Sequence, residues 1–279
     1  MKTILSGRIK EVAIDTAGPV IVIGESINPT RRKKLVATLQ ENDFSYVLEL
    51  AASQIRAGAD ILDVNVGFPG VDDEKLLPGA VRAIQAEFDI PLCLDSPNPK
   101  AIEAALKVSA GKCLINSVNG KEESMNTLLP IASEYKAAII GLCMDDEGIT
   151  NDPEKRVAII KKIIERAVRS GISAEDVIVD PLAMAVSADP NACLVTLETI
   201  RLVHQTLGNN ITMGASNISF GLPDRESLNS AFMTLAVHCG VTCPIANPEK
   251  ITPAVRATDL ILGRDDFAMR FVDYFQSRT

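Results

Sequence analysis

The sequence predicts an α/β fold, a single (β/α)8 TIM barrel over residues 1–279, in which residues 1–18 form an N-terminal extension that caps the barrel bottom. Short β-branched runs alternate about eight times with longer helical patterns. The runs are apolar throughout, as is typical of parallel strands that helices cover on both faces. The length also suits a one-domain barrel, which usually has about 250 residues.

Eight runs are strand candidates and the patterns between them are helix candidates. The strands are expected at Val20–Gly24, Ile61–Asn65, Pro91–Asp95, Cys113–Asn116, Ala137–Cys143, Val177–Asp180, Ile211–Gly214 and, weakly, Cys243–Ala246. The helices are expected at Phe44–Ala57, Asp73–Phe88, Pro99–Ser109, Glu122–Tyr135, Pro153–Ser170, Asn191–Leu207, Asp224–Cys239 and Pro253–Leu262, with a terminal helix at Asp265–Gln276. The first 18 residues are expected to form a hairpin or an extended cap.

Start and stop signals support several of these helices. Asp152 precedes Pro153, so a cap residue stands before a proline in the first turn. Gly58 and Gly171 follow two helical patterns, where a left-handed residue closes a helix. A doubly wound open sheet is the structural alternative, but it would normally carry a glycine-rich loop after the first strand, where this chain reads GESINPTRR.

Charge and composition exclude several classes of partner. The net charge of −8 opposes binding to nucleic acid or to anionic lipid. The chain has neither the apolar segment of a signal peptide nor a run of membrane-spanning length, so a cytoplasmic protein is expected. The six cysteines indicate reduced thiols. No metal of its own is expected, because His238, Cys239 and Cys243 lack the CxxC pairs of structural zinc.

Polar side chains follow six of the predicted strands at their carboxyl ends. They stand in Gly24-Glu25, Asp63-Val64-Asn65, Leu94-Asp95, Ile115-Asn116, Val179-Asp180 and Ser216-Asn217. Asp and Asn often only open turns and cap helices. Active sites of barrels, however, are built at this rim from several strands at once, which favours one shared pocket.

A pterin ring suits such a pocket. Its N3–H and 2-amino groups are adjacent donors that one ionised carboxylate accepts as a parallel pair, an arrangement stronger than bonds between neutral groups. Its O4 and N5 need donors, and asparagine side chains supply them.

Four segments carry a resemblance to a known family: LCLDSPN, LINSVN, VIVDPL and MGASNISFGLPDR. They resemble the methyltetrahydrofolate:corrinoid protein methyltransferase family, which shares its pterin-binding barrel with dihydropteroate synthase and with the folate module of cobalamin-dependent methionine synthase. The similarity runs from about Val20 to Leu262, and the motifs fall on separate strands in the family's order.

The resemblance implies a set of pterin-binding residues, carried over position by position: Asp95, Asn116, Asp180, Gly214, Ser216, Asn217 and, less directly, Asp63 and Asn65 in DVNVG. Asn217 matches the family's mobile asparagine, which reaches the pterin N5. Glu25 and Asn28 match the family's GERIN pattern, written here as GESIN, so Ser26 replaces a positively charged residue.

The resemblance further implies a methyltransferase whose substrate is tetrahydrofolate or methyltetrahydrofolate, whose partner protein carries a cobalt corrinoid, and which forms a homodimer. A methyl group on a neutral tertiary amine is a poor electrophile, so positive charge must develop at N5. The side-chain oxygen of Asn217, accepting a hydrogen bond from a protonated N5, would favour that charge. The direction of transfer does not follow from the residues.

Two other functions are considered. Dihydropteroate synthase shares the pterin pocket, but it ends its seventh strand with serine, arginine and lysine, where this chain reads Ala215-Ser216-Asn217-Ile218. A non-catalytic folate-binding or scaffold subunit is the alternative from another class. The basic run Arg31-Arg32-Lys33-Lys34 is either a solvated first stretch of helix or a binding site for the glutamate tail of folate or the phosphate of the corrinoid, with Arg225 as a second candidate for the tail.

Overall fold

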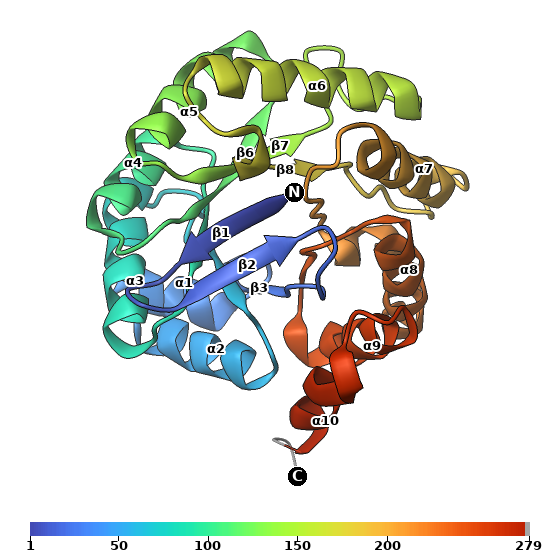
Figure 1. Ribbon diagram of the computed structural model, residues 1–279. Helices are drawn as coiled ribbons and strands as arrows, with labels where there is room; N and C mark the ends of the chain where they lie inside the picture. Colours follow the sequence, from blue (N-terminus) through green and yellow to red (C-terminus); the bar gives the residue numbers. More distant parts are fainter. Residues whose placement is uncertain (277–279) are drawn as a thin grey trace.

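The computed structural model describes residues 1–276 and forms a curved parallel sheet within a ring of helices (Figure 1). Its strands are ordered β8-β7-β6-β5-β4-β3-β9. They span β3 (Ile23–Ile27), β4 (Ile61–Val64), β5 (Leu92–Asp95), β6 (Leu114–Asn119), β7 (Ala138–Leu142), β8 (Val177–Asp180) and β9 (Ile245–Ala246). Neighbouring strands are parallel throughout, as predicted.

The predicted strand at Ile211–Gly214 is not a regular strand, although it occupies the expected place in the barrel. It pairs through isolated parallel bridges, Val179 with Ile211 on one side and Gly214 with Ile245 on the other. Thr212 N–H donates to the Val179 carbonyl at 2.8 Å, and Ile245 N–H donates to the Met213 carbonyl at 2.9 Å. The segment thus fills the gap between β8 and β9, and the predicted barrel is confirmed.

The first barrel strand begins later than the predicted Val20–Gly24. Two N–H groups of this apolar run bond to side chains: Val20 donates to Asp259 at 2.9 Å and Val22 donates to Asp60 at 2.8 Å. The run is buried as predicted. These two N–H groups donate to carboxylates and not to the carbonyls of a neighbouring strand, so the regular strand starts later.

The N-terminal extension folds as an antiparallel hairpin of β1 (Lys2–Ser6) and β2 (Glu11–Asp15). Its buried side chains Leu5, Val12 and Ile14 belong to one apolar cluster with residues from the barrel strands. The side chain of Asn210, next to the closing segment, donates to the Ile14 carbonyl at 2.9 Å. In Figure 1 the two blue strands of the hairpin lie across the ring of helices.

Ten α-helices lie within residues 1–276: α1 (Lys33–Gln40), α2 (Ser45–Arg56), α3 (Asp73–Glu87), α4 (Pro99–Val108), α5 (Glu122–Glu134), α6 (Pro153–Arg169), α7 (Ala192–Thr206), α8 (Arg225–Cys239), α9 (Pro248–Ile261) and α10 (Met269–Gln276). Helices α2 to α8 match the predicted patterns to within one residue at each end. None of these ten helices is long and apolar enough to cross a membrane.

The expected cap signals are present. The Asp152 side chain accepts hydrogen bonds from the N–H groups of Glu154 and Lys155 at the start of α6. Gly58 and Gly171 have φ angles of +92° and +90°. Helix α9, predicted from Pro253, begins at Pro248, where the Asn247 side chain accepts from Glu249 N–H at 3.0 Å. This start carries the same cap-plus-proline signature as α6.

Candidate functional site

A cavity of about 520 Å³ lies at the carboxyl ends of the barrel strands. It brings together side chains from β3, β4, β5, β6 and β8 with the loops that follow the closing segment. The residues predicted from the sequence that line it are Asp63, Asp95, Asn116, Asp180, Gly214, Ser216, Asn217, Arg31, Arg32 and Arg225, together with Glu25, Ser26 and Asn28. The strand-end residues therefore do meet in one space.

Asn65 is the predicted residue that does not line this cavity. Its amide nitrogen donates to the Asp95 carboxylate at 2.9 Å, and its oxygen accepts from Gly67 N–H at 2.9 Å. Asn65 therefore lies beside the cavity and orients Asp95.

The floor of the cavity holds two neighbouring carboxyl groups. Burial, followed by the charge of Asp95, raises the pKa of Asp63 to about 8, against hydrogen bonds that include one from Asn116. The Asn116 amide nitrogen lies 3.2 Å from the Asp63 oxygen that it bonds. Burial also raises the pKa of Asp95, opposed by the hydrogen bond from Asn65. Near neutral pH Asp63 is protonated, so the floor carries less negative charge than the residue types suggest.

Asp180 is the carboxylate at the end of β8. It is 9% exposed, and its Oδ1 accepts from Leu182 N–H at 2.7 Å. Burial raises the pKa of Asp180 to about 6, while the Leu182 hydrogen bond and the positive charge of Arg156 act to lower it. At neutral pH Asp180 is therefore mostly ionised and able to accept a pair of N–H donors.

Asn217 lies on the 3-10 turn Ala215–Ser219, and its side chain is exposed toward the cavity. Its position depends on Gly214, since a Cβ atom there would lie 2.9 Å from the Asn217 amide nitrogen. The glycine, predicted as a pterin contact, leaves room for the asparagine side chain to fold back over the end of the closing segment.

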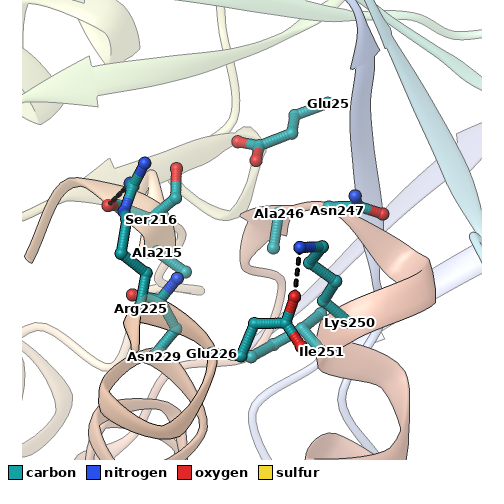
Figure 2. A pocket seen from close by; sticks show the side chains of 10 residues that line it. All are labelled: Glu25, Ala215, Ser216, Arg225, Glu226, Asn229, Ala246, Asn247, Lys250 and Ile251. Atoms are coloured by element: carbon teal, nitrogen blue, oxygen red, sulfur yellow. Dashed lines mark hydrogen bonds and ion pairs between the residues drawn. The ribbon is translucent and has the colours of Figure 1, made fainter. Parts of the chain in front are cut away.

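A second, smaller cavity of about 250 Å³ adjoins the first between α8 and α9 (Figure 2). The two share Glu25, Ser216, Arg225 and Asn247. Arg225 donates to the Ser216 carbonyl at 2.6 Å, the bond marked by one dashed line in Figure 2. The second dashed line is the ion pair between Lys250 and Glu226.

Glu25 stands between these cavities. Burial raises the pKa of Glu25, while a hydrogen bond with the Ser216 side chain and the charges of Arg225 and Arg32 act to lower it. The positive charges that act on Glu25 therefore come from Arg225 and Arg32. Ser26 itself is buried, and its N–H donates to the Gln54 side chain at 2.7 Å.

The four residues of the basic run, Arg31 to Lys34, do not share one helix. Arg31 has a φ of +61°, and helix α1 begins only at Lys33. Arg31 and Arg32 line the large cavity, and the Arg31 guanidinium lies 5.3 Å from the centre of the Phe220 ring. Lys34 points elsewhere and pairs with Glu49 at 3.0 Å. Arg31 and Arg32 thus lie at the cavity, while Lys34 lies on the exposed side of α1.

Four further residues line the cavity without having been predicted: Thr30, Phe220, Ile245 and Asn247. Asn247 was identifiable from the cap-plus-proline signature of Asn247-Pro248, which also marks the rim of the last strand. Phe220 sits in a loop without a regular pattern, so no periodic signal points to it. Across residues 1–276 no cluster of three or more His, Cys, Asp or Glu side chains is arranged to hold a metal ion.

Fold and site together define a (β/α)8 barrel with a cavity at its mouth that carboxyl, amide and guanidinium groups line. The family model described as pterin binding enzyme matches residues 24–247, which is most of the chain. The chain belongs to the pterin-binding enzyme family.

Relatives confirm the resemblance carried by the four motifs. The methylcorrinoid:tetrahydrofolate methyltransferase of Eubacterium limosum is 31% identical over 267 residues, which is 92% of this chain and 96% of that protein. Methionine synthase of Mycobacterium tuberculosis is 29% identical over 266 residues. That match spans 88% of this chain but only 22% of the synthase.

Solved structures agree on the fold. Dihydropteroate synthase of Vibrio fischeri superimposes with a TM-score of 0.71 at 21% identity, covering 94% of this chain and 99% of its own. Dihydropteroate synthase of Yersinia pestis, solved with a pterine-sulfa conjugate, gives 0.69 at 18% identity, with 94% and 99% covered. At this identity the likeness concerns the barrel itself.

Proposed function

We propose that this protein transfers a methyl group between N5 of tetrahydrofolate and the cobalt of a corrinoid carried by a partner protein. The observation that carries the proposal is the meeting of Asp95, Asn116, Asp180 and Asn217 around one cavity of about 520 Å³ at the barrel mouth. The similarity to the methylcorrinoid:tetrahydrofolate methyltransferase of Eubacterium limosum supports it across nearly the whole chain.

The pterin is held by groups of complementary hydrogen-bonding type. Asp180, ionised at neutral pH, accepts from N3–H and the 2-amino group as a charge-assisted pair. Asn116 and Asp95 bind the ring from the neighbouring strands β6 and β5, which place them at paired positions of the sheet. Ser216 contacts the ring from the opposite side of the cavity.

Catalysis requires positive charge at N5. The bond from N5 to the methyl carbon breaks with its electron pair left on nitrogen, so a proton at N5 lets a neutral amine leave. The side-chain oxygen of Asn217 accepts a hydrogen bond from that protonated N5 and holds the proton there. The negative charge of the ionised Asp180 carboxylate also stabilises positive charge at N5.

The corrinoid supplies cobalt(I), a nucleophile that takes the methyl group with its own electron pair. This chain contributes orientation, since the pterin must present N5 toward the approaching partner. No side chain of the barrel needs to form a covalent bond. Transfer in the opposite direction uses the same residues, because it passes through the same transition state.

Absorbance spectroscopy of the cobalt tests this proposal. Cobalamin reduced to cobalt(I) and methyltetrahydrofolate are mixed with and without the protein under anaerobic conditions. We expect the cobalt(I) absorbance to decay at a rate proportional to the protein concentration, with tetrahydrofolate formed in equal amount. A decay rate independent of the protein would contradict methyl transfer by this chain.

We further propose that Arg31, Arg32 and Arg225 attract the glutamate tail of the folate or the phosphate of the corrinoid. All three line the large cavity, and Arg225 also faces the smaller one. Arg31 is exposed and Arg32 and Arg225 are half-buried, so each charge is worth up to about 1 kcal/mol at low salt. Their combined field therefore affects substrate capture more than the chemical step.

Charge reversal tests the tail contact. The double variant Arg31→Glu, Arg32→Glu, which reverses two charges that line the cavity, should raise KM for a polyglutamylated folate about three- to tenfold and leave KM for the monoglutamate less affected. Steady-state kinetics at low and at high salt measure this, and the difference should shrink at high salt. Lys161→Glu, on the exposed face of α6, is the matched control. A KM for the polyglutamylated folate that is the same in the double variant as in the wild type would contradict the contact.

A further inference from the structure

The outer helix α6 carries an arginine that does not face the solvent. Arg156 is only 1% exposed and is the largest fully buried side chain among residues 1–276. Burial lowers the pKa of Arg156, which expresses the cost of taking a guanidinium out of water. A helix that covers a barrel needs only apolar residues on its inner face. The buried guanidinium of Arg156 must therefore be stabilised by the hydrogen bonds that it donates.

The Arg156 guanidinium joins two loops at the barrel mouth. Its Nε donates to the Thr150 carbonyl at 2.7 Å, in the loop after β7. Its Nη1 donates to the carbonyls of Pro181 and Leu182, at 2.6 and 3.1 Å, in the loop after β8. Leu182 has a φ of +63°, a backbone conformation that costs about 1 kcal/mol or more for a residue with a side chain. The two donor bonds from Nη1 stabilise the loop in this conformation.

The same loop directs the carboxylate of the site. Leu182 N–H donates to Asp180 Oδ1 at 2.7 Å, and Asp180 lines the large cavity. Arg156 does not line that cavity. A chain of contacts therefore runs from the guanidinium through the carbonyls of Pro181 and Leu182 to the Leu182 amide and on to Asp180.

We propose that Arg156 is a positioning residue for pterin binding, which fixes the 180–182 loop so that the Asp180 carboxylate faces the pterin. This inference rests on the proposed function. Arg156 also provides the positive charge on the far side of Asp180 from the ligand, and this charge keeps the carboxylate ionised in a buried place.

The titratable and charged groups around Asp180 come from α6, from the segments after β7 and before β9, and from β4 and β5. Arg156 on α6 is the one charged group among them that lowers the pKa of Asp180. The thiols of Cys143, after β7, and Cys243, before β9, have their own pKa values raised by burial and are neutral at pH 5–8. The carboxyls of Asp63 and Asp95 share the cavity with Asp180. Loss of Arg156 should therefore raise the Asp180 pKa from about 6, so that folate binding is lost at a higher pH.

The experiment measures 5-methyltetrahydrofolate binding by calorimetry from pH 5 to pH 8. For Arg156→Gln we expect binding at pH 8 to weaken about tenfold and the pH midpoint of binding to rise by about half a unit or more. Arg156→Lys keeps the charge but not the fork of donors, so its midpoint should stay at the wild-type value while its affinity falls at least about threefold. Arg166→Gln, on the same helix with an exposed side chain, should match the wild type in both.

The outcomes distinguish the proposed function of the protein from the positioning role of Arg156. A wild-type protein that does not bind 5-methyltetrahydrofolate contradicts the proposed function. Wild-type binding together with a folded Arg156→Gln protein of unchanged midpoint overturns the role of Arg156 alone. If the glutamine variant does not fold, as judged by urea unfolding, Arg156→Lys decides: weaker binding supports the role, and wild-type affinity overturns it.

Discussion

Asn217→Ala is expected to slow methyl transfer by one to two powers of ten while the affinity for methyltetrahydrofolate changes little. A hydrogen bond to a charged group is worth about 1.5–3 kcal/mol, and the charge on N5 is fully developed only as the methyl group leaves. The side chain is exposed on its 3-10 turn, so its removal leaves no hole in the core. Single-turnover kinetics and equilibrium binding measure the two quantities separately.

Gly214→Ala offers an independent route to the same loss. Its Cβ would lie 2.9 Å from the Asn217 amide nitrogen and would push that side chain from its place. Asn126→Ala, which removes an exposed asparagine on α5, is the matched control and should transfer methyl groups at the wild-type rate. Unaltered transfer in Asn217→Ala would argue against charge assistance, and a lower affinity at an unchanged rate would limit Asn217 to folate binding.

The helices were predictable because their periodicity reflects burial, which the barrel imposes on each of them. Helices α2 to α8 lie within one residue of their predicted ends. The last two strands were harder, since the segment at Ile211–Gly214 and β9 each pair over one or two residues only. Strand pairing this short leaves little pattern in the sequence, and the start of α9 was misplaced with it.

The rim of the barrel was predictable as a set of residues, but the direction of each side chain was not. Asp63 lies within β4 and Asn65 directly follows it, yet only Asp63 lines the cavity, because the Asn65 side chain bonds to Asp95. Arg156 stands in PEKRVAIIKK among exposed lysines and reads as one more solvated charge. Its burial depends on where the loops after β7 and β8 place their carbonyls, which the local sequence does not specify.

Asp180→Asn is expected to weaken methyltetrahydrofolate binding at pH 8 by about two powers of ten or more. The amide keeps one acceptor but turns an N–H donor toward the donors of the pterin, and the charge-assisted pair is lost. Asp180 is buried, so water does not replace the missing contact. Asp146→Asn, in the exposed loop after β7, is the matched control.

The pH dependence identifies the residue responsible. Burial raises the pKa of Asp180 to about 6, so its ionised form is present above that pH and is lost as the pH falls through it. The affinity of the wild type for methyltetrahydrofolate should therefore decline toward pH 5. The affinity of Asp180→Asn should lack the part of this decline that protonation of Asp180 causes. Asp63 and Asp95 titrate in both proteins, so the difference between the two affinities isolates Asp180. Calorimetry should find the affinities of the two proteins far apart at pH 8 and close together at pH 5, where the protonated carboxyl carries no more charge than the amide. If the ratio of the two affinities is the same at both pH values, another carboxylate accepts from the N–H pair of the pterin.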